Sequence, residues 1–278
     1  MQHSQPIHKI RRALLMLLFF APFYGPSAHA QTPANPLAGT DTANRRNQSS
    51  SPDAGRSGWV IAAYLGGART ASSALTITQP ALNTRIRFDD VSFDARSFDF
   101  PLYYGYRGGY FFGGNPAIGI EAEFIHLKVY SDPQQRVRVT GTYQGGAIAD
   151  EIPLGRIAQR YSISHGVNLL LFNLAARYGV GRGAGESTGR FYLIGRFGVG
   201  PTIPHTESQI DGNRQEQYEI GRAGWQAAGG AEVRLWRGLY WLAEYKFTRT
   251  RQQGKIFSGE AESLLRTHHG VFGLSYHF

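Results

Sequence analysis

The chain ends in THHGVFGLSYHF, residues 267–278, where large apolar side chains recur at every second position. Phe272, Leu274, Tyr276 and Phe278 would share one face, and the residues between them are small or polar. A period of two is typical of a β-strand, because successive side chains point to opposite sides of the pleat. The end of the chain is therefore predicted to be a strand with one apolar face.

Seven further segments alternate in the same way, with apolar and aromatic residues on one face and charged or small residues on the other. They are GWVIAAYLGGA (58–68), SFDFPLYYGYRGGYFF (97–112), AIGIEAEFIHLKVY (117–130), HGVNLLLFNLAARYGV (165–180), RFYLIGRFGVG (190–200), GWQAAGGAEVRLW (224–236) and GLYWLAEYKFT (238–248). With the last strand they make eight.

The connections between these segments alternate in length. The short ones are residues 113–116, 179–190 and 236–238, and the long ones are residues 69–97, 131–164, 201–222 and 249–266. This pattern predicts an all-β fold, an eight-stranded antiparallel up-and-down transmembrane β-barrel with long extracellular loops and short periplasmic turns. Strands of about ten residues suit a tilted crossing of a bilayer. A water-soluble sandwich shares the periodicity and is the alternative.

The N-terminus predicts export. A basic opening with Lys9, Arg11 and Arg12 precedes an apolar run, and the run closes on an A-x-A pattern at Ala28 and Ala30. We therefore expect a signal peptide over residues 1–30, a disordered periplasmic linker over residues 31–57 and a barrel domain over residues 58–278. The expected location is the bacterial outer membrane, after cleavage of the signal peptide.

The composition of the chain limits the kinds of molecule that the protein is expected to bind. The net charge is +9, and the three charges expected to leave with the signal peptide reduce it to +6. A basic exported protein meets anionic lipid, so outer-membrane lipid and lipopolysaccharide are the expected partners and nucleic acid is not. The terminal aromatic Phe278 resembles the signal read by the barrel-assembly machinery, which together with periplasmic chaperones is a further expected partner. The absence of cysteine excludes disulfides and thiolate metal sites.

Charged residues of both signs fall on the face opposite the aromatic one. Inside an eight-stranded barrel, side chains about fill the lumen, so buried charges must pair. A structural network of salt bridges is therefore favoured over a pore. The predicted network comprises Arg107, Glu121, Glu123, Arg177, Arg196, Glu232, Arg234, Glu244 and Lys246.

Histidines gather at one end of the predicted barrel. Counted up from the short turns, His126, His165 and His269 reach the outer-leaflet rim, with His165 and His269 pointing inward and His126 outward. We propose these three as candidate catalytic residues, with Asp94 and Asp99 as candidate ligands of a metal. The alternative is that rim loops collect polar residues by default.

Several stretches resemble the small outer-membrane barrels of the rhizobial lipid A oxidase-like type, also described as porin-family proteins. They are LTITQP (75–80), FDDVSFDARSFDFPLYYGYR (88–107), NPAIGIEAEFIHLKVYS (115–131), SHGVNLLLFNLAARY (164–178), AEYKFTRT (243–250) and THHGVFGLSYHF (267–278). They span nearly the whole predicted barrel.

The resemblance implies an enzyme that oxidises the proximal glucosamine of lipid A to 2-aminogluconate, using oxygen and a divalent metal. It implies no particular catalytic residue. A non-enzymatic structural or adhesion barrel of the OmpA or OmpX type is the alternative, and a narrow porin channel is a third possibility.

Overall fold

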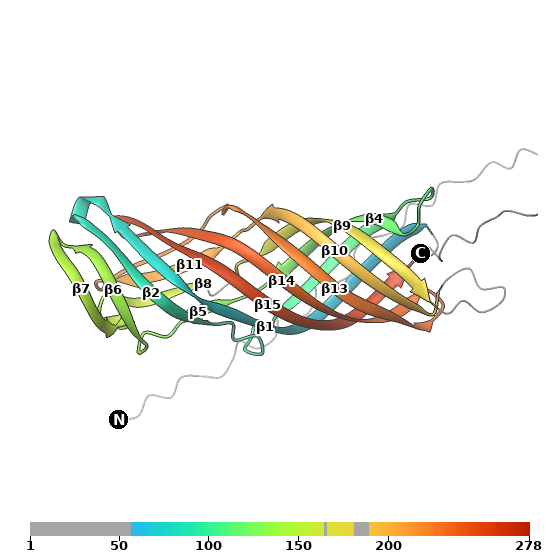
Figure 1. The fold of residues 1–278 in the computed structure, drawn as a ribbon, viewed down its shortest axis with the longest axis horizontal. Helices are drawn as coiled ribbons and strands as arrows, with labels where there is room; N and C mark the ends of the chain where they lie inside the picture. The colour runs from blue at the N-terminus through green and yellow to red at the C-terminus, as the bar shows by residue number, and fades with distance from the viewer. Residues whose placement is uncertain (1–56, 164–165, 181–188) are drawn as a thin grey trace, which may run out of the picture. The chain divides into compact units, whose positions relative to one another are not determined.

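The computed structural model describes residues 57–163, 166–180 and 189–278, which form fifteen β-strands and two short 3₁₀ turns. Eight of the strands close into an antiparallel barrel (Figure 1). The expected signal peptide and all of the expected linker except Ser57 lie outside the described residues. None of the helical turns in the described part of the chain has the length or hydrophobicity to cross a membrane.

The barrel strands follow one another around the wall in chain order, and the last one returns to the first. They are β1 (Gly58–Gln79), β3 (Tyr104–Phe111), β4 (Ile118–His126), β9 (Leu169–Val180), β10 (Phe191–Pro201), β13 (Ala223–Trp236), β14 (Leu239–Ile256) and β15 (Gly259–His277). The predicted fold class is confirmed.

Closure depends on β1, which is bonded on both sides. β15 pairs with it over nearly its full length, from Val60 opposite His277 to Thr78 opposite Glu260. Its other edge pairs with β3 up to Leu65 and with β2 from Thr70 onward. One strand therefore carries the wall from the barrel into a second region.

That second region replaces the four predicted long loops, which are mostly strands. We call it the extension. It consists of the ends of β1, β14 and β15 together with β2 (Thr84–Asp94), β5 (Val129–Ser131), β6 (Arg136–Tyr143), β7 (Gly146–Pro153), β8 (Ala158–Ile163), β11 (His205–Ile210), β12 (Asn213–Tyr218) and the 3₁₀ turns η1 (Pro80–Leu82) and η2 (Leu154–Arg156). Figure 1 shows these strands continuing the wall away from the C-terminus.

Along β15 the polarity of the two faces reverses. Near the C-terminus Phe272 and Leu274 point outward and are about half exposed, as expected for contact with lipid. Beyond His268 the outward side chain is Arg266, whereas Leu265 and Ala261 point inward and are buried. The barrel is thus apolar outside, and the extension is apolar inside.

The neighbouring strand β14 reverses at the same level. Tyr245 and Phe247 point outward beside the end of the barrel, and Arg249 and Arg251 follow on the same face. Phe247 lies opposite His268 in the ladder. The predicted strands end near this level because charged residues replace aromatic ones on the outer face beyond it.

The extension has a hydrophobic core of its own. Leu75, Ile77, Ile86 and Phe88 project inward from β1 and β2 and are fully buried. Val139 from β6 lies opposite Phe88 in the ladder and is also fully buried. Burial of this kind provides the favourable free energy that an unstructured loop lacks.

The extension is also held by tight turns and polar contacts. Asp211 and Gly212 both have positive φ and form the two-residue turn between β11 and β12. The Tyr143 hydroxyl donates to Asp211 Oδ1 at 2.7 Å. Burial, followed by this bond and the carboxylate charge, raises the pKa of Tyr143 to about 12.

One predicted strand begins too early. Residues 97–103 are not strand, and Phe98 and Phe100 are 80% and 91% exposed. Pro101 has no N–H for a ladder bond, and a turn brings Asp99 N to Arg96 O at 3.2 Å. The alternation of aromatic residues in the sequence therefore extends over a loop, residues 97–103, that precedes β3.

Phe88→Ala should loosen the extension while leaving the barrel closed. The cavity it creates is expected to cost about 3–5 kcal/mol, because Phe88 is fully buried. Limited proteolysis of protein refolded in detergent should then cut between residues 131 and 163. Phe98→Ala is the matched control and should leave protection unchanged, because Phe98 is largely exposed. Equal protection in both variants would contradict a packed extension.

Candidate functional site

The barrel lumen is crossed by a network of charged side chains. Arg107 Nη1 lies 3.0 Å from Glu244 Oε2, and Arg196 reaches the same oxygen at 2.6 Å. Arg196 Nε also donates to Glu121 Oε2 at 2.5 Å. Arg107 is within 3.9 Å of Glu121 as well. Strands on opposite sides of the lumen are therefore joined through shared carboxylates.

Glu123 is the second centre of this network. Lys246 Nζ donates to Glu123 Oε1 at 2.5 Å and approaches Glu244 Oε1 at 2.6 Å. The Tyr64 hydroxyl donates to Glu123 Oε1 at 2.6 Å. Asn173 donates to the other oxygen at 2.9 Å, and Gln226 also binds that oxygen. The carboxylate is thereby surrounded by donors, as a buried charge requires.

Close approach of the backbone makes room for this packing. The Tyr64 ring lies against Gly105, where an added Cβ would overlap the ring.

At the periplasmic end of the network, His277 Nε2 lies 2.8 Å from Glu232 Oε2. Of the nine charged residues predicted to face the lumen, eight are buried and Arg234 is half-buried. The eight buried ones comprise four of each sign.

The predicted histidines do not form one site. His126 has outward parity but is buried, because the segment ending at Asn168 covers it, and its Nδ1 lies 2.8 Å from Asn168 Oδ1. Tyr104 stacks on its ring at 4.9 Å. His269 points inward, with Nδ1 3.0 Å from the Tyr103 hydroxyl and Nε2 2.9 Å from Thr248 Oγ1. His165 lies outside the described residues.

The two predicted metal ligands lie together on the outer surface. Asp94 and Asp99 both line a pocket of about 360 Å³ above the rim, with Arg96 beside them. The Arg96 backbone N–H donates to Asp94 Oδ1 at 3.1 Å. Lys128 Nζ donates to the Asp99 carbonyl at 2.7 Å, and burial lowers the pKa of Lys128. Cations of the protein occupy the surroundings of both acids.

These residues do not fit the metal that the resemblance implies. Of the acids and histidines that the structure describes, one group of three has ligand atoms within 4.8 Å of one another, and it contains neither Asp94 nor Asp99. It consists of His205, Glu207 and Glu216 on the β11–β12 hairpin. We therefore derive no reaction through a metal at the predicted site.

Sequence reasoning did not identify that group. The available signals were His205-Thr206-Glu207, which puts two ligand types on one face of a strand, and the Asp211-Gly212 turn, which typically marks a hairpin. Both lie in the segment expected to be a loop. Glu216 joins them only through the pairing of β11 with β12.

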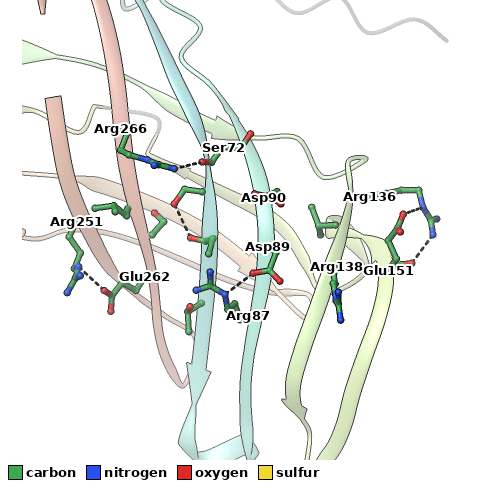
Figure 2. A pocket seen from close by; sticks show the side chains of 16 residues that line it. Ser72, Arg87, Asp89, Asp90, Arg136, Arg138, Glu151, Arg251, Glu262 and Arg266 are labelled. Atoms are coloured by element: carbon green, nitrogen blue, oxygen red, sulfur yellow. Dashed lines mark hydrogen bonds and ion pairs between the residues drawn. The ribbon is translucent and has the colours of Figure 1, made fainter. Parts of the chain in front are cut away.

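A second feature that was missed is a groove on the outer face of the extension, with a volume of about 800 Å³. We call it the arginine groove, because five arginines line it: Arg87, Arg136, Arg138, Arg251 and Arg266. Figure 2 shows them spread side by side over β2, β6, β14 and β15.

Carboxylates pair with three of the five arginines. Arg87 lies 2.8 Å from Asp89, Arg136 3.1 Å from Glu151 and Arg251 3.3 Å from Glu262 (Figure 2). Arg266 donates to the Ser72 carbonyl at 3.3 Å, beside a β-bulge in β1. Within the described ranges, Arg138 makes no ion pair.

An apolar outer band, a closed eight-stranded wall and short turns at one end define an outer-membrane β-barrel protein. The chain belongs to the outer membrane protein β-barrel domain family, whose model matches residues 60–278. The outer membrane is therefore its location. No curated protein is significantly similar to the chain in sequence.

Solved outer-membrane barrels are similar in fold at low sequence identity. OprG from Pseudomonas aeruginosa is 13% identical over 81% of this chain and 98% of its own, with a TM-score of 0.44. Neisserial surface protein A is 8% identical over 79% and 97%, with a TM-score of 0.36. The outer membrane protease OmpT from Escherichia coli is 10% identical over 84% and 99%, with a TM-score of 0.38. No activity transfers at this distance.

Lys246→Met should destabilise the barrel by about 3–5 kcal/mol, because it leaves Glu123 and Glu244 buried with fewer cations. Urea unfolding in phospholipid vesicles measures the change. Lys255→Met is the matched control, since Lys255 is mostly exposed and its contact to Glu219 is 3.6 Å long. Equal unfolding midpoints for the two variants would show that the network contributes nothing to stability.

Proposed function

We propose that this protein is a non-enzymatic outer-membrane barrel of the structural or adhesion kind, which presents the arginine groove to the cell exterior as a binding surface. The single observation that carries the proposal is that groove. It lies on folded strands with a hydrophobic core beneath them, so the backbone that carries its side chains is fixed before a ligand arrives.

The groove chemistry suits an anionic saccharide. Arginine presents a planar fork of donors that matches a phosphate or sulfate group, and carboxylates beside it accept hydrogen bonds from sugar hydroxyls. Arg138 and Arg266 have no carboxylate partner in the described structure, so they are the two cations that a ligand would engage first. The groove is open to solvent, and binding should weaken as salt rises.

A channel is disfavoured by the lumen. Arg107, Arg196 and Lys246 each bridge two or more carboxylates from different strands. Opening a path would break several buried ion pairs together, and each broken pair costs several kcal/mol.

Lipid A oxidation, which the resemblance implies, stays a prediction and is the second candidate. The position of the histidines favours it, because His126 and His269 both lie near the level where the outer face changes from apolar to charged. Their contacts do not favour it, since both ring nitrogens of His269 are bound to hydroxyl groups inside the barrel.

The arginine groove is tested with Arg138→Ala combined with Arg266→Ala. Purified protein in detergent should bind sulfated dextran oligosaccharide and not unsulfated dextran, and the double variant should bind about tenfold more weakly or worse. Isothermal titration calorimetry measures the affinity. Arg156→Ala, an exposed arginine outside the groove, is the control and should bind as the parent does. Equal loss in the control, or none in the double variant, would remove the groove as the binding site.

Deletion of the gene separates the two candidate functions. We expect the mass spectrum of lipid A to be the same in the deletion strain and its parent, because a binding barrel changes no lipid. Disappearance of a lipid A species that differs by one oxidation step, with its return on complementation, would establish the oxidase and reject our proposal. His126→Ala and His269→Ala would then identify the residues responsible.

A further inference from the structure

The β11–β12 hairpin brings three side chains that can ligate a metal to one place, two of them buried and one exposed. His205 and Glu207 are two residues apart on β11, so they share a face. Glu216 lies directly opposite Glu207 on β12, and Tyr218 lies opposite His205. The two-residue turn at Asp211 and Gly212 fixes this register, and a slip of one residue would move Glu216 to the other face.

Two carboxylates face each other across the hairpin, Glu207 on β11 and Glu216 on β12. Like charges directly opposite each other on neighbouring strands destabilise the pair. Glu207 lies 3.0 Å from Arg160 and Glu216 lies 3.2 Å from Arg214, in each case through Oε2. Both arginines are more than half exposed, so water screens much of their effect. His205 Nε2 lies 3.1 Å from Glu216 Oε1, on the inner side of the group.

The spacing of the three ligands is close to that of a coordination shell. Ligand atoms 2.0–2.1 Å from a tetrahedral zinc ion are separated by about 3.3 Å. The separation of His205 Nε2 from Glu216 Oε1 already matches this value. One ligand atom from each of the three residues lies within 4.8 Å of the others.

Neighbouring groups hold these ligands in orientation. The Tyr218 ring stacks on the imidazole of His205 with 4.0 Å between centroids. The side chains of His205 and Glu207 are 5% and 9% exposed, whereas Glu216 is 40% exposed. The group is therefore rigid on one side and open to solvent on the other, as an entry path for an ion requires.

The geometry points to a binding site for a divalent transition-metal cation of the Zn²⁺ class, held by His205 Nε2, Glu207 and Glu216, with water completing the shell. An imidazole with two carboxylates favours such an ion over Ca²⁺ or Mg²⁺, which prefer oxygen ligands alone. Only an unprotonated imidazole nitrogen can bind the ion, so the site needs His205 Nε2 without a proton.

The site is distinct from the arginine groove and does not depend on the function proposed above. A bound cation would cross-link the two strands of the hairpin. Among the strands that the structure describes, β12 is terminal in the sheet and pairs only with β11. A cation bound by both strands would replace the repulsion between Glu207 and Glu216 with a shared bond, and so would hold this edge in place.

The test uses the purified full chain in detergent without a polyhistidine tag. Zn²⁺ titrated against a competing fluorescent chelator should reveal one site per chain, and excess Ca²⁺ should not displace the zinc. Glu207→Gln and Glu216→Gln keep the shape of the side chains, and each should weaken binding about a hundredfold. His205→Ala should abolish it. His268→Ala is the matched control, since His268 is exposed on the barrel and outside the cluster.

Folding of each variant is checked independently by circular dichroism and by protease protection of residues 205–218. Co²⁺ in place of Zn²⁺ should give the visible absorption of a four-coordinate ion in the parent and in His268→Ala, but not in His205→Ala. No binding by the folded parent, or binding that survives Glu207→Gln and Glu216→Gln, would overturn the proposal. Weaker binding in acid is expected, because a protonated imidazole cannot bind metal.

Discussion

Closure of the wall between β1 and β15 is the constraint on which the structure depends. In hydrocarbon no water is available to satisfy an unpaired backbone N–H or C=O, so a sheet that crosses a membrane cannot keep a free edge. Here the first and last strands meet over nearly their full length. The same ladder continues beyond the barrel, so the extension is not a separate module joined by a linker. It shares three strands with the part that crosses the membrane.

Closure also explains why the lumen is charged and yet full. A wall that is apolar toward lipid leaves its alternate residues facing inward, and eight strands leave little space among them. Glu123 on β4 and Glu244 on β14 are satisfied by Arg107 on β3, Arg196 on β10 and Lys246 on β14. The network therefore ties distant strands together laterally, in addition to the hydrogen bonds that join neighbours.

The barrel was predictable from the sequence because its signal is local. Phe272 and Leu274 project to lipid as the alternation predicts, and the inward parity of His269 is confirmed by its contacts with Tyr103 and Thr248. The extension was missed because the same alternation there runs with opposite polarity, so that Arg249 occupies a position equivalent to Tyr245. Its strands resemble ordinary soluble β-structure and were interpreted as loops.

The sites were less predictable than the fold, because their residues come together only through strand register. Glu216 reaches His205 because the Asp211-Gly212 turn is two residues long. Arg138 and Arg266 line one groove although two strands lie between them. Asp94 and Asp99 line one pocket, and the cations Arg96 and Lys128 lie beside them. Counting residues along one strand predicts how far a side chain lies from the short turns. It does not predict which side chains of other strands lie beside it.

The change of the outer face of β15 from apolar to charged at His268 fixes how deeply the barrel is inserted in its bilayer. Moving the barrel inward by two residues would carry Arg266 and Arg249 into hydrocarbon, and moving it outward by two would expose a ring of aromatic side chains to water. Either displacement is opposed by several outward side chains at once. The arginine groove and the β11–β12 hairpin are thus held at a fixed distance above the lipid.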